Sequence, residues 1–334
     1  MPRCRMQCHT ILTVCLAALS CAPVVAAETW RLKSDQTWES TAAGPDDQYL
    51  QAIAELKKLV QGGDATAAQD IVRQLKSEYP DRVGPDLDLF VTGELRYWSD
   101  LYGKALVSYE RLLKNYPGSE FADIVMQREY DMAQAYLQGR SKTVLGFMRI
   151  SGYGEGVAIM EKLSDRAGID EPNSVGLNAA IAVADLYERT RQYLEAYLKW
   201  SEIASYWETG PIGKRAMYRM AEDNFAAYNL HPEATRFRFD GSKLKTARAY
   251  YEKYLALYPD DARKEDVPDK IKIIDEEIAL KQFQIGQYYR HLGKHQAAYL
   301  YFDMVIQNWP KTEAAELAKQ AIAENLNGEQ ASGK

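Results

Sequence analysis

A motif that ends a helix recurs three times along the chain and constrains its fold more than any other feature. In the first copy Ala105 is followed by Tyr109, Leu112 and Pro117. The same spacing returns as Ala247, Tyr251, Tyr254 and Pro259 and as Ala298, Phe302, Val305 and Pro310. Apolar residues spaced by four and three share one face of a helix, and the proline ends that helix. A repeated unit of this kind predicts stacked helix pairs, which usually serve as binding surfaces, so we expect a scaffold before an enzyme.

Composition narrows the possible functions. The 334-residue chain is 46% hydrophobic and 26% charged, which is ordinary for a soluble protein with a well-buried core. Its net charge of −6 argues against a dedicated nucleic-acid binder, which normally carries a basic patch. The cysteines all lie near the N-terminus, at Cys4, Cys8, Cys15 and Cys21. We therefore expect no disulfide, thiol nucleophile or thiolate metal site in the folded body.

Residues 1–27 have the features of an export signal peptide. Arg3 and Arg5 precede a short apolar stretch, and no acidic residue occurs before Glu28. Two cleavage sites fit this segment. Cleavage before Glu28 follows small residues and suits ordinary signal peptidase, whereas the four residues that end at Cys21 resemble a bacterial lipobox. The second alternative would leave Cys21 as a lipidated N-terminus, and both alternatives stay open from these residues.

The rest of the chain divides into three parts. Residues 28–45 are polar and predict a tether ahead of the fold. From Gln48 onward the apolar residues are spaced by three and four, and no alternating run reaches strand length. This spacing predicts an all-α solenoid over residues 46–326, followed by a disordered tail over residues 327–334.

Two helix pairs carry the fullest set of repeated positions. These are Ala184, Tyr187, Ala196 and Trp200 in one pair and Gly286, Tyr289, Ala298, Phe302 and Pro310 in the other. The pattern resembles the tetratricopeptide repeat, in which small residues let two helices cross closely and an aromatic ring fills the space between neighbouring pairs. The resemblance implies a right-handed superhelical solenoid of about six helix pairs.

Two insertions interrupt the repeats, near residues 138–155 and 229–243. Insertions in solenoids form loops on one face, which is often the binding face. In the second insertion Arg236 and Arg238 alternate with phenylalanines and form a basic cluster. A protein partner or an acidic membrane surface could bind this cluster; the alternative is a solvated loop with two buried rings.

Three local patterns point towards ligand chemistry, but each has a simpler explanation. The glycine-rich stretch 152–156 follows no strand and lacks the lysine of a phosphate-binding loop, so a flexible loop is expected. His291 and His295 have a metal-ligand spacing but flank a turn. Glu276 and Glu277 fall on a helix surface, where charge normally serves solubility. The sequence therefore predicts no catalytic residue, no metal site and no cofactor.

A closer family resemblance appears in the last third of the chain. The stretch from Asp275 to Gly293 reads Asp-Glu-Glu-Ile-Ala-Leu-Lys-Gln-Phe-Gln-Ile-Gly-Gln-Tyr-Tyr-Arg-His-Leu-Gly. It resembles the C-terminal repeat of BamD, a family of outer-membrane lipoproteins of the bacterial β-barrel assembly machinery. The helix that follows ends in Trp309 and Pro310, where the family has tyrosine and proline. The resemblance is specific over residues 243–317, and this chain is longer than the usual five-repeat version.

The BamD resemblance implies a non-catalytic scaffold on the periplasmic side of the outer membrane, either lipid-anchored or soluble in the periplasm. It also implies protein partners, namely a barrel-assembly subunit and unfolded outer-membrane proteins. The C-terminal repeats of the family dock the barrel-inserting partner, so the expected partner-facing residues are Tyr289, Arg290, Tyr299 and Tyr301. An alternative is a periplasmic repeat adaptor for the cell-wall or division machinery. Such adaptors usually carry an N-terminal coiled coil, and residues 29–45 show no heptad pattern.

Overall fold

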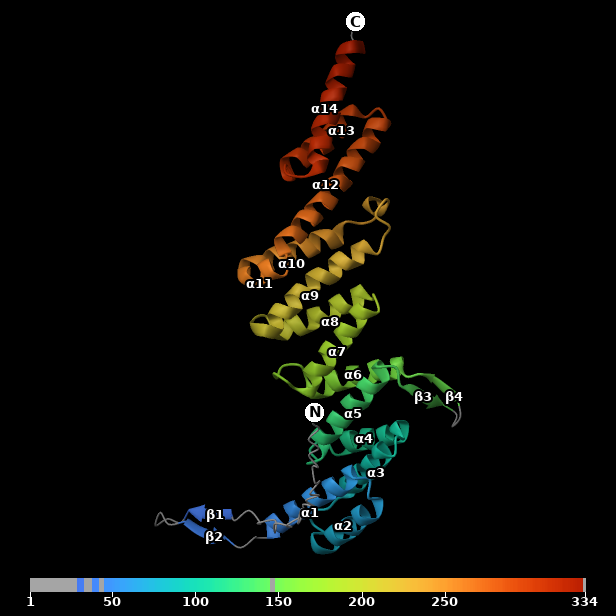
Figure 1. The fold of residues 1–334 in the computed structure, drawn as a ribbon, viewed down its shortest axis with the longest axis vertical. Coiled ribbons are helices and arrows are strands. Elements are labelled where there is room, and N and C mark those ends of the chain that lie inside the picture. The colour runs from blue at the N-terminus through green and yellow to red at the C-terminus, as the bar shows by residue number, and fades with distance from the viewer. Residues whose placement is uncertain (1–28, 33–37, 42–44, 145–147, 333–334) are drawn as a thin grey trace, which may run out of the picture. The chain divides into compact units, whose positions relative to one another are not determined.

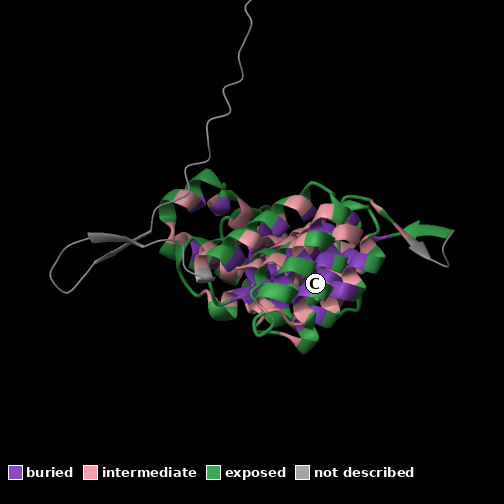
Figure 2. Cartoon of the chain, turned by 90° about the horizontal axis from the view of Figure 1, so that it is seen from below, coloured by how far each residue is buried: buried purple, intermediate pink, exposed green. Residues whose placement is uncertain are grey.

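Helices make up most of the chain, as the spacing of its apolar residues predicts. The computed structural model describes residues 29–32, 38–41, 45–144 and 148–332. The chain divides into two compact units, Met1–Val83 and Gly84–Lys334. Figure 1 shows the course of the helices, and Figure 2 shows buried residues gathered between them. The all-α class and the repeat architecture are therefore confirmed.

The first unit contains a hairpin and one helix pair. Strand β1 (Thr29–Leu32) pairs antiparallel with β2 (Trp38–Thr41), so the segment predicted as a polar tether includes a hairpin. The pair consists of α1 (Pro45–Gln61) and α2 (Ala65–Glu78). The turn between these two helices ends at Asp64, whose carboxylate accepts a 3.0 Å hydrogen bond from the backbone N–H of Ala67 in α2.

The second unit contains five more helix pairs, so the described residues hold the six pairs predicted. The pairs are α3 (Pro85–Trp98) with α4 (Tyr102–Asn115), α5 (Ala122–Leu137) with α6 (Tyr153–Ala167), α7 (Val175–Arg189) with α8 (Tyr193–Tyr206), α9 (Gly210–Asn229) with α10 (Ser242–Leu257), and α12 (Val267–His291) with α13 (His295–Asn308). The short helix α11 (Pro259–Lys264) precedes the last pair, and α14 (Glu313–Ser332) follows it. Where a disordered tail was expected from residue 327, the structure continues α14 to Ser332.

Small residues let the two helices of a pair approach closely. A Cβ atom on Gly93 of α3 would lie 2.3 Å from the ring of Tyr109 on α4. A Cβ atom on Gly286 of α12 would likewise lie 2.6 Å from the ring of Phe302 on α13. Both rings are completely buried. Each glycine therefore leaves the space that the aromatic ring of its partner helix fills.

The aromatic-proline pairs end their helices in nearly identical geometry. Helices α4, α10 and α13 stop before Tyr116, Tyr258 and Trp309, whose φ angles are −134°, −134° and −133°. Their ψ angles are 60°, 61° and 55°, outside the helical region. The following proline disfavours helical backbone at the preceding residue, so the motif found in the sequence acts as a local stop signal.

The expectation that no strand follows Gln48 was wrong at the first insertion. Strand β3 (Ser141–Val144) pairs antiparallel with β4 (Met148–Ser151), and this hairpin projects from the pair α5 and α6 (Figure 1). Four-residue strands are too short for their alternation to stand out in the sequence. The flexible loop expected over residues 152–156 is corrected too, because α6 begins at Tyr153.

The second insertion is folded against α12. It contains a short 3-10 turn over Arg236–Arg238. The ammonium group of Lys281 on α12 donates hydrogen bonds to the carbonyl oxygens of Phe237 and Phe239, at 2.8 and 2.5 Å. Phe239 stacks on His231 with 3.7 Å between ring centres and keeps 42% of its surface exposed. The alternative of a solvated loop with two buried rings is therefore incorrect.

Candidate functional site

At one junction between successive helix pairs, buried polar contacts join the two pairs. Glu94 on α3 is almost completely buried. It accepts a 2.5 Å hydrogen bond from the hydroxyl of Tyr109 on the second helix of its own pair. Arg128 on α5, in the next pair, donates to both oxygens of the same carboxylate, at 3.0 and 3.2 Å. Burial and the neighbouring carboxylate raise the pKa of Tyr109, so its hydroxyl stays protonated and donates.

The same three-part contact occurs at two further junctions. Trp200 donates a 2.6 Å hydrogen bond to Glu188, and Arg219 of α9 lies 3.1 Å from that carboxylate. Tyr251 donates to Glu222, and Lys270 of α12 approaches the same oxygen to 2.6 Å. We call these three sets the carboxylate bridges. In each carboxylate bridge an ion pair links the first helix of one helix pair to the first helix of the next pair.

The pair α5 and α6 lacks such a bridge. On α6 the position equivalent to Tyr109, four residues after the small residue of the helix, is the buried Met160, which has no hydroxyl or indole N–H to donate. Gln134, which follows Ala133 as Glu94 follows Gly93, donates instead to the hydroxyl of Tyr130 at 3.0 Å. Among the described residues no carboxylate links α5 to α7 here, and a groove lies between these two helices.

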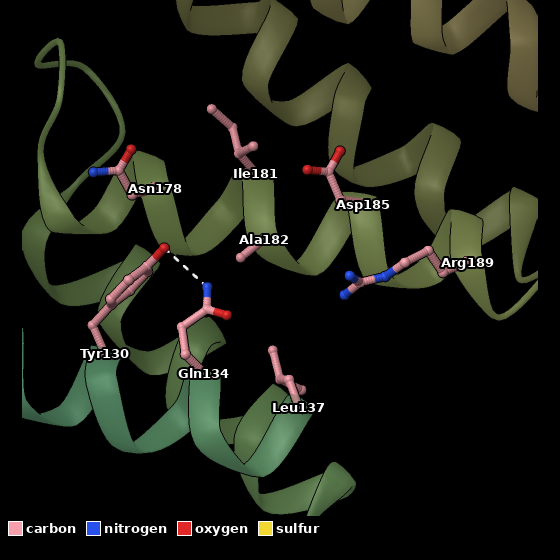
Figure 3. A pocket seen from close by; sticks show the side chains of 8 residues that line it. All are labelled: Tyr130, Gln134, Leu137, Asn178, Ile181, Ala182, Asp185 and Arg189. Atoms are coloured by element: carbon pink, nitrogen blue, oxygen red, sulfur yellow. Dashed lines mark hydrogen bonds between the residues drawn. The ribbon is translucent and has the colours of Figure 1, made fainter. Parts of the chain in front are cut away.

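The groove between α5 and α7 has a volume of about 210 Å³ and is our candidate functional site (Figure 3). Its lining residues are Tyr130, Gln134, Leu137, Asn178, Ile181, Ala182, Asp185 and Arg189. In Figure 3 the first three project from α5 and the other five from α7, on facing sides. Leu137, Ile181 and Ala182 supply apolar surface, and polar groups such as the Gln134 amide lie among them. A groove of this composition suits an apolar side chain flanked by polar backbone.

Charge in the groove is asymmetric. Asp185 is neutralised by Arg215 of α9, whose Nη2 donates to both carboxylate oxygens at 2.7 and 2.8 Å. Arg189, at the end of α7, has no ion-pair partner among the described residues. The groove therefore presents one uncompensated cation, which favours an acidic group on whatever binds there.

A second hollow of about 320 Å³ lies beyond the end of α7. It is lined by Arg191, Tyr193, Glu222, Phe225, Ala226, Asn229 and Leu230. These residues come from the turn before α8 and its first residue, and from the second half of α9 and the residue after it. Arg191 again has no ion-pair partner among the described residues. Arg189 and Arg191, two residues apart in the sequence, thus line two different hollows of the second unit.

The structure separates the tyrosines that were predicted to face a partner. Tyr299 is half exposed. Tyr289 and Tyr301 are partly buried and stack on each other, with ring centres 5.5 Å apart. Arg290 forms an ion pair of 3.2 Å with Glu324 of α14. Of the four, Tyr299 is therefore the one most available to a partner, and the others also support the last helix pair.

The two arginines of the basic cluster in the second insertion have different surroundings. The guanidinium of Arg236 lies 2.6 Å from Glu277 of α12 and donates to Asn229 at 3.0 Å. Arg238 is exposed and lies over the ring of Phe237, 5.6 Å from its centre. Arg236 thus fastens the insertion to α12, and Arg238 keeps its charge at the surface. This cluster lies nearer the middle of α12, whereas the tyrosine group lies at its C-terminal end.

Three remaining expectations concern membrane attachment and metals. Cys21, the candidate lipidation site, lies outside the described residues. Among the described helices, none combines the length and hydrophobicity needed to cross a bilayer. In the same part of the chain, no three His, Cys, Asp or Glu side chains are grouped to hold a metal ion.

The groove residues were not singled out from the sequence, although the repeat itself contains the signal. Tyr130 and Ile181 each precede the small residue of their helix, Ala133 or Ala184, by three positions. Residues at that offset in successive first helices face one another across the groove (Figure 3). Comparing equivalent repeat positions would have found them, but the hollow between α5 and α7 is a tertiary feature.

Tandem helix pairs with these repeated contacts define a tetratricopeptide-repeat protein. The model of a protein family described as "YfiO: Outer membrane lipoprotein" matches residues 195–333, from within α8 to beyond α14. The resemblance to outer-membrane lipoproteins predicted from the sequence is thereby confirmed over this part of the chain. The match also supports a place in the cell envelope.

Solved structures of repeat proteins are similar at low identity. PilW, described as a widely conserved type IV pilus biogenesis factor, is 16% identical, with 81% of this chain and 97% of PilW aligned and a TM-score of 0.28. A tetratricopeptide repeat protein from Parabacteroides merdae ATCC 43184 is 15% identical, with 81% of this chain and 96% of that chain aligned and a TM-score of 0.31. Because both TM-scores are low, no functional feature of this chain is inferred from these two structures. Comparison with the curated proteins gives no match.

Proposed function

We propose that this chain is a non-catalytic periplasmic scaffold of the machinery that assembles β-barrel proteins in the outer membrane. The observation that carries the proposal is the match of residues 195–333 to an outer membrane lipoprotein family. The fold is consistent with this role, because stacked helix pairs offer a large preformed surface and need no reacting group. The partners we propose are a barrel-assembly subunit and unfolded outer-membrane proteins.

The groove between α5 and α7 would hold an extended segment of such a partner. Leu137 and Ile181 offer apolar contact, and Asn178 and the hydroxyl of Tyr130 offer hydrogen bonds. Arg189 would bind a carboxylate of the segment, because no described acidic residue neutralises it. Binding would order the segment on a rigid surface, and no covalent step is required.

Photo-crosslinking in intact cells tests the proposal. A photoreactive amino acid at Ile181 would lie in the groove, and one at Leu198 of α8, which is 57% exposed, serves as the matched surface control. We expect Ile181, and not Leu198, to capture a barrel-assembly subunit or unfolded outer-membrane proteins. Capture of cell-wall or division enzymes alone at Ile181 would overturn the proposal in favour of the adaptor alternative.

Charge reversal tests the role assigned to the groove arginine. Arg189→Glu should weaken binding of an acidic partner segment by roughly tenfold, because an attractive contact becomes repulsive. Arg111→Glu, at an exposed position of α4, makes the same change in net charge away from the groove. Equal effects of the two substitutions on the dissociation constant would mean that net charge, and not the groove, governs binding.

Membrane attachment is tested by the intact mass of the mature protein from its native membrane fraction. A mass that begins at Cys21 and includes a diacylglyceryl and an acyl group would support lipid anchoring at the outer membrane. A mass that begins at Glu28 would indicate a soluble periplasmic protein, and the adaptor alternative would gain weight.

A further inference from the structure

The β3–β4 hairpin is held firmly at its base. Arg140, which precedes β3, forms an ion pair with Asp100 and lies over the ring of Tyr102, 3.9 Å from its centre. After β4, a Cβ atom on Gly152 would lie 2.3 Å from the ring of Tyr136, so only glycine fits there. These contacts reach two neighbouring helix pairs. They fix the direction in which the hairpin leaves the solenoid.

The hairpin has two chemically different faces. Side chains alternate across a strand, so Met148 and Ile150 share one face and Arg149 and Ser151 share the other. Met148 and Ile150 keep 43% and 45% of their surface exposed. Lys142, opposite Ile150 in the register, forms an ion pair with Glu155 at 2.5 Å. The apolar pair is therefore presented to solvent next to a neutralised cation.

The outer edge of β4 is also open. All four residues of β4 are exposed, and among the described residues the sheet consists of β3 and β4 alone. An isolated two-stranded ribbon is marginally stable in water, and an uncovered edge presents backbone groups to another chain. A third strand would satisfy these groups and cover the apolar pair.

The charge of the hairpin indicates what the third strand carries. Residues 138–154 contain three cations and no acidic residue, although the whole chain has a net charge of −6. Arg140 and Lys142 are paired with Asp100 and Glu155, which leaves Arg149 without an ion-pair partner among the described residues. An acidic side chain beside Arg149 would complement it.

We propose that β4 captures an extended segment of an unfolded client as a third antiparallel or parallel strand. The segment alternates apolar and polar residues, so that one side packs on Met148 and Ile150, and it places an acidic residue beside Arg149. Strands of membrane β-barrels have this alternation. The client class rests on the proposed function, whereas the strand addition rests on the hairpin itself. Because Arg149 lies on the face opposite the apolar pair, a strand fits the hairpin better than a flat lipid surface.

Peptide binding to the full mature chain tests the proposal. The probe is a fluorescent ten-residue peptide of alternating valine and serine with one central glutamate, followed by fluorescence anisotropy. An N-methylated analogue keeps every side chain but cannot donate backbone hydrogen bonds. We expect the probe to bind and the analogue to bind at least roughly tenfold more weakly. Equal binding of the two peptides would overturn the proposal, because strand addition requires the backbone.

Two variants locate the binding on the hairpin. The double variant Met148→Ser, Ile150→Ser removes the apolar face and should weaken the probe by roughly tenfold. Leu198→Ser removes an apolar side chain of α8 that is exposed to 57%, more than either hairpin residue, and should leave binding unchanged. Circular dichroism would check that both variants stay folded. Loss of binding in the Leu198 variant, or none in the double variant, would contradict the assignment.

Two further measurements distinguish strand capture by the hairpin from binding in the groove and from binding to lipid. If Arg189→Glu abolishes probe binding and the hairpin variant does not, the groove binds the segment, so the hairpin proposal fails while the proposed function stands. Vesicles of phosphatidylethanolamine and phosphatidylglycerol provide the second measurement. If wild type sediments with the vesicles and the hairpin variant does not, the hairpin contacts lipid and strand capture is overturned.

Discussion

The three carboxylate bridges form a graded series that predicts how much each contributes to stability. The side chains of Glu94, Glu188 and Glu222 are 2%, 16% and 33% exposed. Replacing each glutamate by glutamine keeps its shape but removes the charge that its cationic partner faces. Removing one partner of a buried ion pair costs about 3–5 kcal/mol, whereas an exposed pair contributes about 0–1 kcal/mol.

We therefore expect the free energy of unfolding to fall by about 3 kcal/mol in Glu94→Gln and by about 1 kcal/mol in Glu222→Gln, with Glu188→Gln between them. The loss at Glu94 is largest because Arg128, itself 14% exposed, would keep only its longer ion pair of 3.8 Å with the more exposed Asp131. The double variant Glu94→Gln, Arg128→Met should recover part of this loss in the free energy of unfolding, since it also removes the buried positive charge of Arg128.

Urea unfolding followed by circular dichroism measures these differences. Amide hydrogen exchange locates them, because repeat arrays can open one junction at a time. We expect faster exchange in the helices on both sides of the altered junction. Equal losses at the three sites, or a larger loss at Glu222 than at Glu94, would refute burial as the quantity that sets the strength of a bridge.

Three other predictions follow from single sites. Burial raises the pKa of Glu129 from 4.5 to about 8, so the folded protein holds this proton more tightly than the unfolded chain. The stability of the protein should therefore fall as pH rises between these values, and Glu129→Gln should flatten this dependence. Unfolding midpoints at pH 5 and pH 8 check it. Gly93→Ala should destabilise the chain by about 1–3 kcal/mol in thermal melts, because the new Cβ meets the ring of Tyr109, whereas Gly154→Ala in α6 meets nothing and should stabilise by up to about 1 kcal/mol. Asp64→Ala removes the cap of α2 and should cost about 1 kcal/mol, seen as faster hydrogen exchange in its first turn.

The hairpins and the groove show what sequence reasoning missed. Each strand of the β3–β4 hairpin is only four residues long, so its alternation gives a weak signal beside the long helical period. The predicted partner residues Tyr289 and Arg290 were found from a resemblance, which does not tell whether a side chain faces a partner or its own helix. In the structure these two contact Tyr301 and Glu324. These contacts are contributed by two later helices of the chain, α13 and α14.

The sequence by itself determined the helix pairs, their close crossings and their ends. These features depend on residues within one or two helices, such as Gly93 with Tyr109 or the proline after Tyr116, and local geometry decides them. Only the tertiary structure decided which charges meet. Glu94 and Arg128 are 34 residues apart, and their contact exists because successive helix pairs stack. The groove opens for the same reason, where stacking brings α5 beside α7 without a bridge between them.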